Sequence, residues 1–225
     1  MCSHYETLKA REALEALGAV LPADWEPPRF SADVFPGGQG MFVRRPREAD
    51  SGDEAVPEIE VLPGVFGLLP FWAKDAKLAR QTYNARSETV TSKPSFRDAW
   101  KRAQHCIIPA PAIYEPDWRS GKAVPTRITR ADGEPLGIAG LWERWKDAGG
   151  QVVHSFTMLT VNADDHELMR NFHRPDKEKR MVVILPRGLY SDWLDAPPER
   201  SMEFMRQFPA DRLHAEAHPT AEKAS

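Results

Sequence analysis

Short runs of apolar and β-branched residues recur along the chain and predict a β-rich core. Eight runs have the length and composition of strands. They cover residues 59–62, 65–69, 106–108, 112–114, 124–129, 136–142, 152–161 and 181–185. Apolar residues at helical spacing predict six short helices, at residues 6–17, 75–80, 95–102, 164–171, 189–194 and 198–208.

The order of these elements indicates the fold class. The strands do not alternate regularly with crossover helices, which argues against a doubly wound parallel sheet. We therefore expect an α+β fold with a mixed, partly closed β-barrel-like core flanked by helices. Residues 22–57 are rich in Pro, Gly and charge and should form long loops around short strands. No low-complexity linker divides the chain, so we expect one compact domain. Residues 196–225 are expected to form a helical, acidic extension.

Charge is spread unevenly along the chain. The whole sequence carries 30 Lys and Arg against 33 Asp and Glu, a formal charge of −3, which excludes nucleic-acid binding by bulk charge alone. Residues 74–102 nevertheless hold eight basic and three acidic residues, a net charge of +5. Aromatic side chains interleave with these charges: Phe71, Trp72, Tyr83, Phe96 and Trp100. This combination is typical of surfaces that follow a phosphate backbone and stack unpaired bases, and the alternative is a solvated face over core aromatics.

Several classes of protein are disfavoured by what the sequence lacks. Two cysteines form no disulfide framework, which favours a reducing compartment and a cytoplasmic location. There is no secretory signal, and the longest apolar runs fall far short of the roughly 18 to 20 residues of a membrane helix. The glycine-rich stretch 37–40 lacks the Lys-Ser/Thr of a phosphate loop, and the histidines lack metal-ligand spacing. We expect no membrane partner, no nucleotide or other cofactor, and no metal.

Cys2 carries the most distinctive chemistry. Methionine aminopeptidase removes Met1 when the second residue is small, so the mature chain should begin with a free 1,2-aminothiol. An α-amine with a pKa near ~8 condenses with an aldehyde to a Schiff base, which the adjacent thiol can close into a thiazolidine. The alternative is an arbitrary second residue at a frayed terminus. Cys106 lies within an apolar run and should be an inert core thiol.

Other polar residues near the ends of apolar runs are further candidates. Asn84 can donate and accept hydrogen bonds, and Arg86 can bind a phosphate bidentately, although both also suit an Asn turn before a capped helix. Glu115 ends an apolar run, where burial raises a carboxyl pKa toward the range of general acid–base catalysis; the alternative is an ion-paired structural Glu. His173 precedes a core strand and can shuttle protons near neutral pH, or serve as a structural or exposed histidine.

Several blocks of the sequence form a recognisable series. In order they are Cys2, GLLPFWAK at 67–74, NARSET at 84–89, FRDAW at 96–100 with HCIIPA at 105–110, IYE at 113–115, AGLWE at 139–143, TVN at 160–162, and His173 followed by RMVVIL at 180–185. In this order and with these gaps, they resemble the SRAP (SOS response-associated peptidase) domain over residues 2–195. The resemblance implies a single α+β domain that binds single-stranded DNA and captures abasic sites through its N-terminal cysteine.

The resemblance also implies roles for individual residues. Asn84 would position the Cys2 terminus, Glu115 would relay protons, and His173 would assist opening of the abasic sugar. DNA contacts are implied for Phe71, Trp72, Lys74, Arg86, Thr160, Arg174 and Arg180. We therefore expect a monomer that forms a covalent thiazolidine with the ring-opened abasic sugar and is associated with the nucleoid when bound to damaged DNA. Two alternatives use the same residues: a cysteine peptidase that removes its own Met1, and a noncovalent single-stranded DNA-binding module.

Three departures from the family pattern concern the site. Ser3 and His4 replace the usual Gly-Arg after the cysteine, and Pro116 and Asp117 separate the Tyr-Glu block from Trp118. In the histidine block, residues 174–179 are inserted before Arg180-Met181, and Val182 replaces a proline. Since the inserted residues are polar or proline, an outward bulge that leaves the imidazole in place is favoured over a displaced histidine. Alternatively, Arg174 takes the place of the usual arginine.

Overall fold

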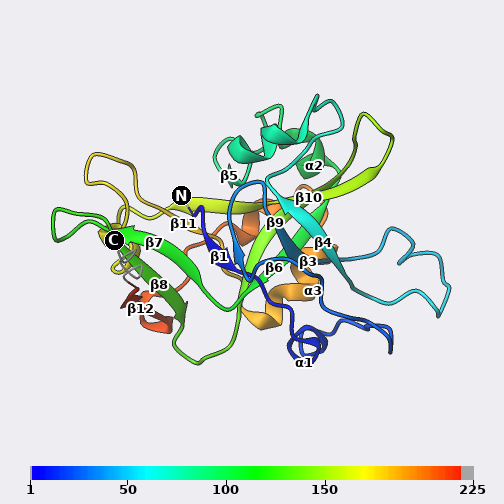
Figure 1. Ribbon diagram of the computed structural model, residues 1–225, viewed down its shortest axis with the longest axis horizontal. Coiled ribbons are helices and arrows are strands. Elements are labelled where there is room, and N and C mark those ends of the chain that lie inside the picture. Colours follow the sequence, from blue (N-terminus) through cyan, green and yellow to red (C-terminus); the bar gives the residue numbers. More distant parts are fainter. Residues whose placement is uncertain (1, 219–225) are drawn as a thin grey trace, which may run out of the picture.

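Five strands pair edge to edge into a closed ring in the computed structural model, which describes residues 2–218 (Figure 1). The ring contains β3 (Gln39–Arg44), β4 (Glu60–Phe66), β6 (His105–Ala110), β9 (Leu136–Lys146) and β10 (Val152–Asn162). Their order is β10-β4-β3-β6-β9, and β9 pairs again with β10. The β4–β10 pair is parallel and the other four are antiparallel. The expected α+β class with a barrel core is confirmed, and the barrel is closed.

The second sheet lies beside the barrel and carries the N-terminal segment. Its order is β12 (Leu213–Ala217), β8 (Val124–Arg130), β7 (Ile113–Asp117), β1 (Tyr5–Glu6) and β2 (Asp33–Val34). In Figure 1, β7, β8 and β12 lie to the left of the barrel strands. The sheet is antiparallel throughout, and Tyr5 of β1 pairs with both Val34 and Ile113.

The far end of β10 extends beyond the barrel and pairs with two further strands. β5 (Asn84–Arg86) runs parallel to it, with Asn84 opposite Met158 and Arg86 opposite Thr160. β11 (Arg180–Val182) runs antiparallel, with Asn162 opposite Arg180. One long strand therefore brings β5, which holds Asn84 and Arg86, close to β11, which holds Arg180, although these two strands are far apart in the sequence.

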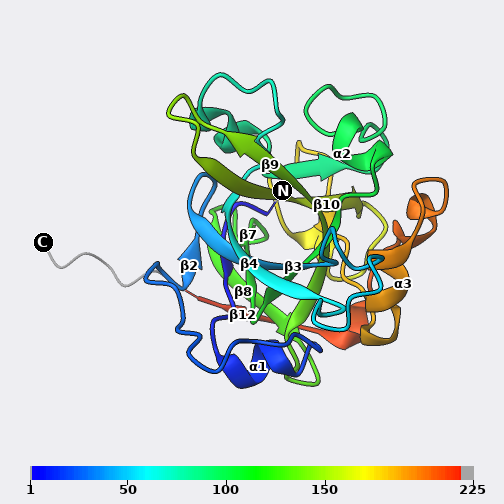
Figure 2. The same ribbon diagram turned by 90° about the vertical axis from the view of Figure 1, so that its right-hand side faces the viewer.

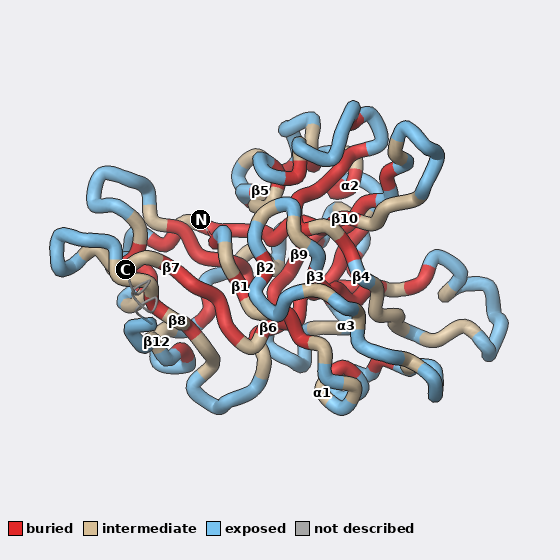
Figure 3. The backbone as a smooth tube through the Cα atoms, in the orientation of Figure 1, coloured by how far each residue is buried: buried red, intermediate tan, exposed pale blue. Residues whose placement is uncertain are grey.

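Helices are short and lie outside the sheets (Figure 2). They are α1 (Arg11–Glu15), η1 (Ala76–Gln81), α2 (Arg97–Lys101), η2 (Met169–Asn171), η3 (Arg187–Leu189), α3 (Tyr190–Asp195), η4 (Ser201–Phe204) and η5 (Ala210–Arg212), where η denotes a 3-10 helix. The buried residues follow the strands, and the connecting loops are largely exposed (Figure 3). Inside the barrel Phe66 and Phe42 each pack against Phe156, with ring centroids 5.7 and 5.5 Å apart.

The expected helix over residues 6–17 is largely wrong, because only α1 forms. The backbone N–H of Glu6 donates to the carbonyl of Ala112, and that of Thr7 donates to the carbonyl of Ala32. These long-range pairs draw the start of the segment into the second sheet. Tertiary backbone pairing outweighs the helical propensity of the segment, which differs between residue types by only about 0.7 kcal/mol per residue.

One strand expectation in the first half of the chain needs correction. The runs at 59–62 and 65–69 were expected to be two strands, but β4 is a single strand that continues through Pro63 and Gly64 and ends at Phe66. The stretch 22–57 contains β2 and β3 between loops, as expected, and the centre of β3 is buried. The glycine-rich turn ahead of β3 obscured an apolar run of only three residues.

The C-terminal extension differs from the helical tail expected for residues 196–225. In its described part only η4 and η5 are helical, and β12 pairs with β8 along its whole length. Phe208 and Leu213 are buried in the main core, so this part is integral to the fold. Residues 219–225 lie outside the described residues. The expected helix over 164–171 is reduced to the single turn η2.

Gly67 sits at a position that only glycine can occupy without strain. Its φ is +126°, and a Cβ atom there would overlap the backbone of Ala79 in η1. We therefore expect Gly67→Ala to lower the free energy of unfolding by at least about 3 kcal/mol, measured by urea denaturation. Gly188→Ala is the matched control, because the space around Gly188 is open and the change should be within about 0.5 kcal/mol. Equal stability of the two variants would contradict this account.

Candidate functional site

Cys2 is held against β7 by backbone pairing that continues from β1. The carbonyl of His4 accepts a hydrogen bond from the N–H of Tyr114 at 2.9 Å, one residue beyond the Tyr5–Ile113 pair. Cys2 is buried, with 1 % of its surface exposed, and its Sγ donates to the His4 carbonyl at 3.4 Å. The N-terminal segment thus joins the sheet at His4 and Tyr5, which leaves Cys2 buried just ahead of β1.

The side chain of Asn84 binds the backbone of Cys2. Its Nδ2 donates to the Cys2 carbonyl oxygen at 2.7 Å, and this contact sets the orientation of the amide, since the reverse orientation would place two oxygens together. The remaining atom, Oδ1, is buried and accepts no hydrogen bond within residues 2–218. Buried polar atoms are rarely left without a partner, so an acceptor of this kind beside Cys2 is suited to a donor that binds there.

Glu115 lies on β7 with 3 % of its surface exposed. Burial raises the pKa of its carboxyl to about 7, because the ionised form loses its water. Burial also raises the pKa of the Cys2 thiol to about 12, and the nearby charge of Glu115 adds to this. At neutral pH the thiol is therefore protonated, while Glu115 is poised between its two protonation states.

His173 is held by both its backbone and its ring. Its N–H donates to the carbonyl of Pro116 at 3.0 Å, and its own carbonyl accepts from Lys179 Nζ at 3.2 Å. The residue adopts a φ of +63°, which is uncommon outside glycine and requires such anchoring. The ring Nε2 is 3.2 Å from the Arg180 carbonyl, and Nδ1 is 3.3 Å from Glu115 Oε2.

These contacts define where the protons lie. A carbonyl oxygen only accepts, so His173 Nε2 carries a hydrogen and donates it to Arg180. Burial lowers the pKa of His173 to about 4, so the ring is neutral at neutral pH and its Nδ1 is an acceptor. A protonated Glu115 can donate to that nitrogen, in agreement with its raised pKa. When Glu115 is protonated, it and His173 therefore form a neutral pair with one shared proton beside the Cys2 thiol.

A cleft of about 340 Å³ opens beside this pair. Its lining residues are Arg86, Pro116, Trp118, His173, Arg174, Lys177, Glu178 and Arg180. The segment 174–178 is exposed, so the insertion projects outward while the His173 ring stays beside Glu115. The Arg174 guanidinium lies over the Trp118 ring at 5.2 Å from its centroid. Two departures from the family pattern, at Trp118 and at 174–179, thus meet in one wall of the cleft.

The residues expected to contact DNA divide into two groups. Phe71, Trp72, Lys74, Arg86 and Arg174 are exposed, and the two aromatic side chains are 67 % and 44 % exposed. They remain available to a ligand, as expected. Of the other aromatics interleaved with the basic stretch 74–102, Phe96 and Trp100 are buried, so for these two the alternative of core aromatics is correct.

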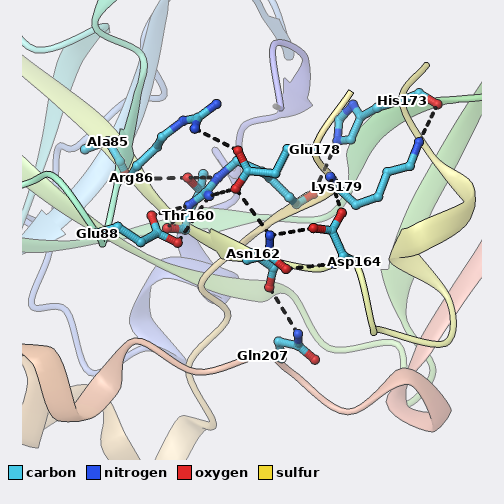
Figure 4. Close-up of polar contacts among 11 residues, drawn as sticks. Ala85, Arg86, Glu88, Thr160, Asn162, Asp164, His173, Glu178, Lys179 and Gln207 are labelled. Atoms are coloured by element: carbon cyan, nitrogen blue, oxygen red, sulfur yellow. Dashed lines mark hydrogen bonds and ion pairs between the residues drawn. The ribbon is translucent and has the colours of Figure 1, made fainter. Parts of the chain in front are cut away.

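Thr160 and Arg180 do not fit the expectation of a DNA contact. Both are buried, with 0 % and 1 % of their surface exposed. Arg180 donates to Glu88, Glu178 and the Thr160 carbonyl, and its Nε lies 3.2 Å from Thr160 Oγ1 (Figure 4). In this arrangement the two side chains hold β10, β11 and the segment after β5 together.

Four residues that line the cleft were not candidates from the sequence: Pro116, Trp118, Lys177 and Glu178. The available signal was their position within or beside the departures from the family pattern. A larger hollow of about 680 Å³ lies between α3 and the segment 200–209, away from Cys2. Within residues 2–218, no group of three His, Cys, Asp or Glu side chains is arranged to bind a metal, and no helix is long and apolar enough to cross a membrane.

Comparison with known proteins adds to this geometry. Residues 1–222 match the family described as SOS response associated peptidase (SRAP). Two abasic site processing proteins of Bacillus subtilis are similar over 156 residues, or 67 % of this chain: YoaM at 33 % identity and YoqW at 34 %. The match spans 64 % and 65 % of those proteins, less than two thirds of their length. A crystal structure of a Bordetella bronchiseptica protein is 51 % identical with a TM-score of 0.85, covering 97 % of this chain and 100 % of that one.

The neutral Glu115–His173 pair has a consequence for stability that can be measured against pH. Glu115 keeps its proton up to about pH 7 in the folded chain, whereas an ordinary Glu loses it near 4.5, so its contribution to stability is lost as pH rises between these values. His173, with a folded pKa of about 4 against an ordinary 6.5, contributes the opposite slope between pH 4 and 6.5. In the wild type, these two contributions to the pH dependence of the unfolding free energy largely cancel.

In Glu115→Gln, the pH dependence of the unfolding free energy that comes from His173 should no longer be cancelled by that from Glu115. We expect its unfolding free energy, relative to the wild type, to increase by about 1 to 3 kcal/mol as pH rises from 4.5 to 7. Urea denaturation at each pH measures this difference, with the same substitution at the exposed Glu199 as the control. A difference that stays constant with pH would show that Glu115 is ionised in the folded protein.

Proposed function

The chain belongs to the SOS response associated peptidase (SRAP) family, and on that premise we propose that it captures abasic sites in single-stranded DNA through the amine and thiol of Cys2, once Met1 has been removed. The observation that carries this proposal is the burial of the Cys2 thiol with Asn84, Glu115 and His173 beside a basic cleft. The names of YoaM and YoqW support abasic sites as the target.

The proposed reaction begins with the amine, because the thiol is protonated at neutral pH. An abasic site exposes an aldehyde at C1′ of the ring-opened sugar. The α-amine forms a bond to C1′, and the aldehyde oxygen leaves as water, giving an imine. The sulfur then bonds to C1′, and the thiol proton passes to the nitrogen by way of Glu115. The product is a thiazolidine, which shields the strand from β-elimination.

Each neighbouring group has a task in this sequence. Asn84 Nδ2 holds the Cys2 carbonyl, and its unpartnered Oδ1 is suited to accept a hydrogen from the α-amine. Glu115, with a pKa of about 7, accepts the thiol proton and returns it on reversal. Neutral His173 holds Glu115 in place through Nδ1, and for ring opening this nitrogen would exchange Glu115 for the hydroxyl of the closed sugar.

The DNA-binding part of the proposal rests on exposed groups. Arg86 and Lys74 would bind backbone phosphates, and Phe71 and Trp72 would stack on unpaired bases. The loop that displays these aromatics is anchored on either side: the N–H of Leu69 donates to Ser155 Oγ at 2.9 Å, and Trp145 Nε1 donates to the Ala73 carbonyl at 2.8 Å. A single strand suits this surface, because its backbone can bend to bring one sugar into the cleft. A cytoplasmic location remains a prediction.

Purified protein without Met1 should form a heat-stable crosslink with abasic single-stranded DNA, visible on a denaturing gel, and Cys2→Ala should abolish it. Cys106→Ala is the matched control, because Cys106 is equally buried but internal to β6, and its crosslink should be unchanged. Retained Met1, checked by mass spectrometry of the N-terminus, should also prevent capture, since it holds the amine in a peptide bond.

The same experiment separates the alternatives. An undiminished crosslink in Cys2→Ala would show that the thiol is dispensable and would assign the nucleophile to an amine, either the α-amine or a lysine. Noncovalent binding alone, unaffected by Cys2→Ala, would favour a simple single-stranded DNA-binding module. Removal of Met1 that depends on Cys2, without any crosslink, would favour a peptidase that acts on its own N-terminus.

Glu115→Gln should slow capture or release by about 10²-fold, because it keeps the shape of the side chain but cannot take a proton. The ratio of wild-type to variant rate should rise with pH through about 7 and then level off, as Glu115 ionises. Affinity for undamaged DNA should not change. His173→Ala should also be slower, provided that thermal melts show a folded protein. Unchanged rates in His173→Ala would remove His173 from the mechanism and leave Cys2 and Glu115 in it.

A further inference from the structure

Glu178 occupies a central position in the basic cleft. Its Oε2 accepts from Arg86 Nη1 at 2.7 Å, and its Oε1 accepts from Arg180 Nη1 at 2.6 Å (Figure 4). Asn162 Nδ2 lies 3.3 Å from the same Oε1. One carboxylate therefore bridges two guanidinium groups that come from β5 and β11.

This arrangement resembles that of an arginine pair around a phosphate. A phosphodiester also presents two oxygens that share one negative charge, and guanidinium groups bind carboxylates and phosphates with similar geometry. Arg174 and Lys177 line the same cleft, so four of its lining residues are basic and Glu178 is the single acidic one among them. The cleft therefore has the charge of an anion site, and Glu178 supplies the anion.

The contacts of Arg86 and Arg180 differ in a way that would permit a phosphate to replace Glu178 at Arg86. Arg180 is buried and also pairs with Glu88 at 2.8 Å, so it keeps an anionic partner when Glu178 leaves. The Arg86 side chain is 45 % exposed, and ion pairs at such positions contribute only about 0 to 1 kcal/mol. Breaking the Arg86–Glu178 ion pair, so that another anion can bind Arg86, therefore costs little free energy.

The loop itself can stay in place during such an exchange. Lys179 Nζ donates to the Arg174 carbonyl at 2.7 Å, and the Lys179 N–H donates to Asp164 Oδ1 at 2.8 Å. These bonds close the loop at its base. A rotation of the Glu178 side chain is sufficient to free Arg86.

We propose that Glu178 is a built-in competitor of the DNA backbone, whose carboxylate holds the position of a phosphate at Arg86 and must be displaced before the strand binds there. The proposal rests on the proposed function, because it concerns the phosphate subsite of the same cleft. Glu178 lowers the affinity of the cleft for a single strand by occupying this phosphate subsite. The competing carboxylate is contributed by the insertion 174–179.

The test measures noncovalent binding of a fluorescent oligothymidine by anisotropy at several salt concentrations, with Cys2→Ala throughout to prevent crosslinking. Glu178→Gln keeps the shape and removes the charge. It should bind about 3- to 10-fold more tightly at low salt, and the slope of log K against log salt should steepen by about one phosphate contact. Glu178→Ala repeats the test with the carboxyl group removed.

Asp176→Asn is the matched control. It removes the same charge from the same loop, but Asp176 is 67 % exposed and lies 3.5 Å from Lys177. It should change affinity by less than about 2-fold, because Asp176 is solvated and pairs with Lys177, whereas Glu178 pairs with Arg86. In an Arg86→Ala background the gain from Glu178→Gln should disappear, because the competitor then has no phosphate site to block.

Unchanged or weaker binding by Glu178→Gln, a gain matched by Asp176→Asn, or a gain that survives Arg86→Ala would each overturn the proposal. A heat-stable crosslink in the chain with Cys2, together with any of these results, would leave the proposed function intact. Absence of salt-dependent binding in every variant would overturn both the competitor and the proposed DNA interface.

Discussion

The site depends on one backbone constraint, which is the pairing of the N-terminal segment with β7. The Tyr114–His4 hydrogen bond and the Tyr5–Ile113 pair bring Cys2 beside Glu115, and Asn84 then closes the position from the barrel side. A free terminus would move among many conformations, and its ordering costs roughly 1 to 2 kcal/mol per residue. Here the cost is offset by sheet hydrogen bonds and by burial of Tyr5 against Phe66, with ring centroids 5.2 Å apart.

Burial gives these residues their chemistry as well as their position. The same exclusion of water keeps the thiol protonated, raises the pKa of Glu115 and lowers that of His173. At neutral pH an exposed Glu would be fully ionised, and an exposed His, with a pKa of about 6.5, would still be charged in part. The bond from His173 Nε2 to the Arg180 carbonyl then decides the tautomer, so the backbone of β11 controls which nitrogen faces Glu115.

Residue types at the ends of apolar runs predicted much of the site. The sequence did not predict which strands distant in the chain would pair. Glu115 was recognisable because it ends a run that had to be a buried strand, and burial alone accounts for its raised pKa. The closed barrel was not recognisable, because closure requires β9 to pair with β10 and β3 to lie between β4 and β6. For the same reason residues 6–17 were assigned a helix: no local pattern shows that Tyr5 pairs with Ile113.

The arginines illustrate why the sequence alone does not separate exposed candidate residues from buried ones. Arg86 and Arg180 look equivalent in a motif, but β5 exposes the first at the cleft while β11 places the second beneath it. A buried guanidinium must be paired, so Arg180 is committed to Glu88 and the Thr160 carbonyl. Arg86 has no such commitment, because water can solvate it when Glu178 turns away. The two arginines sharing one carboxylate therefore have different roles: Arg180 holds the strands that form the cleft, and Arg86 is the cation that an incoming anion can reach.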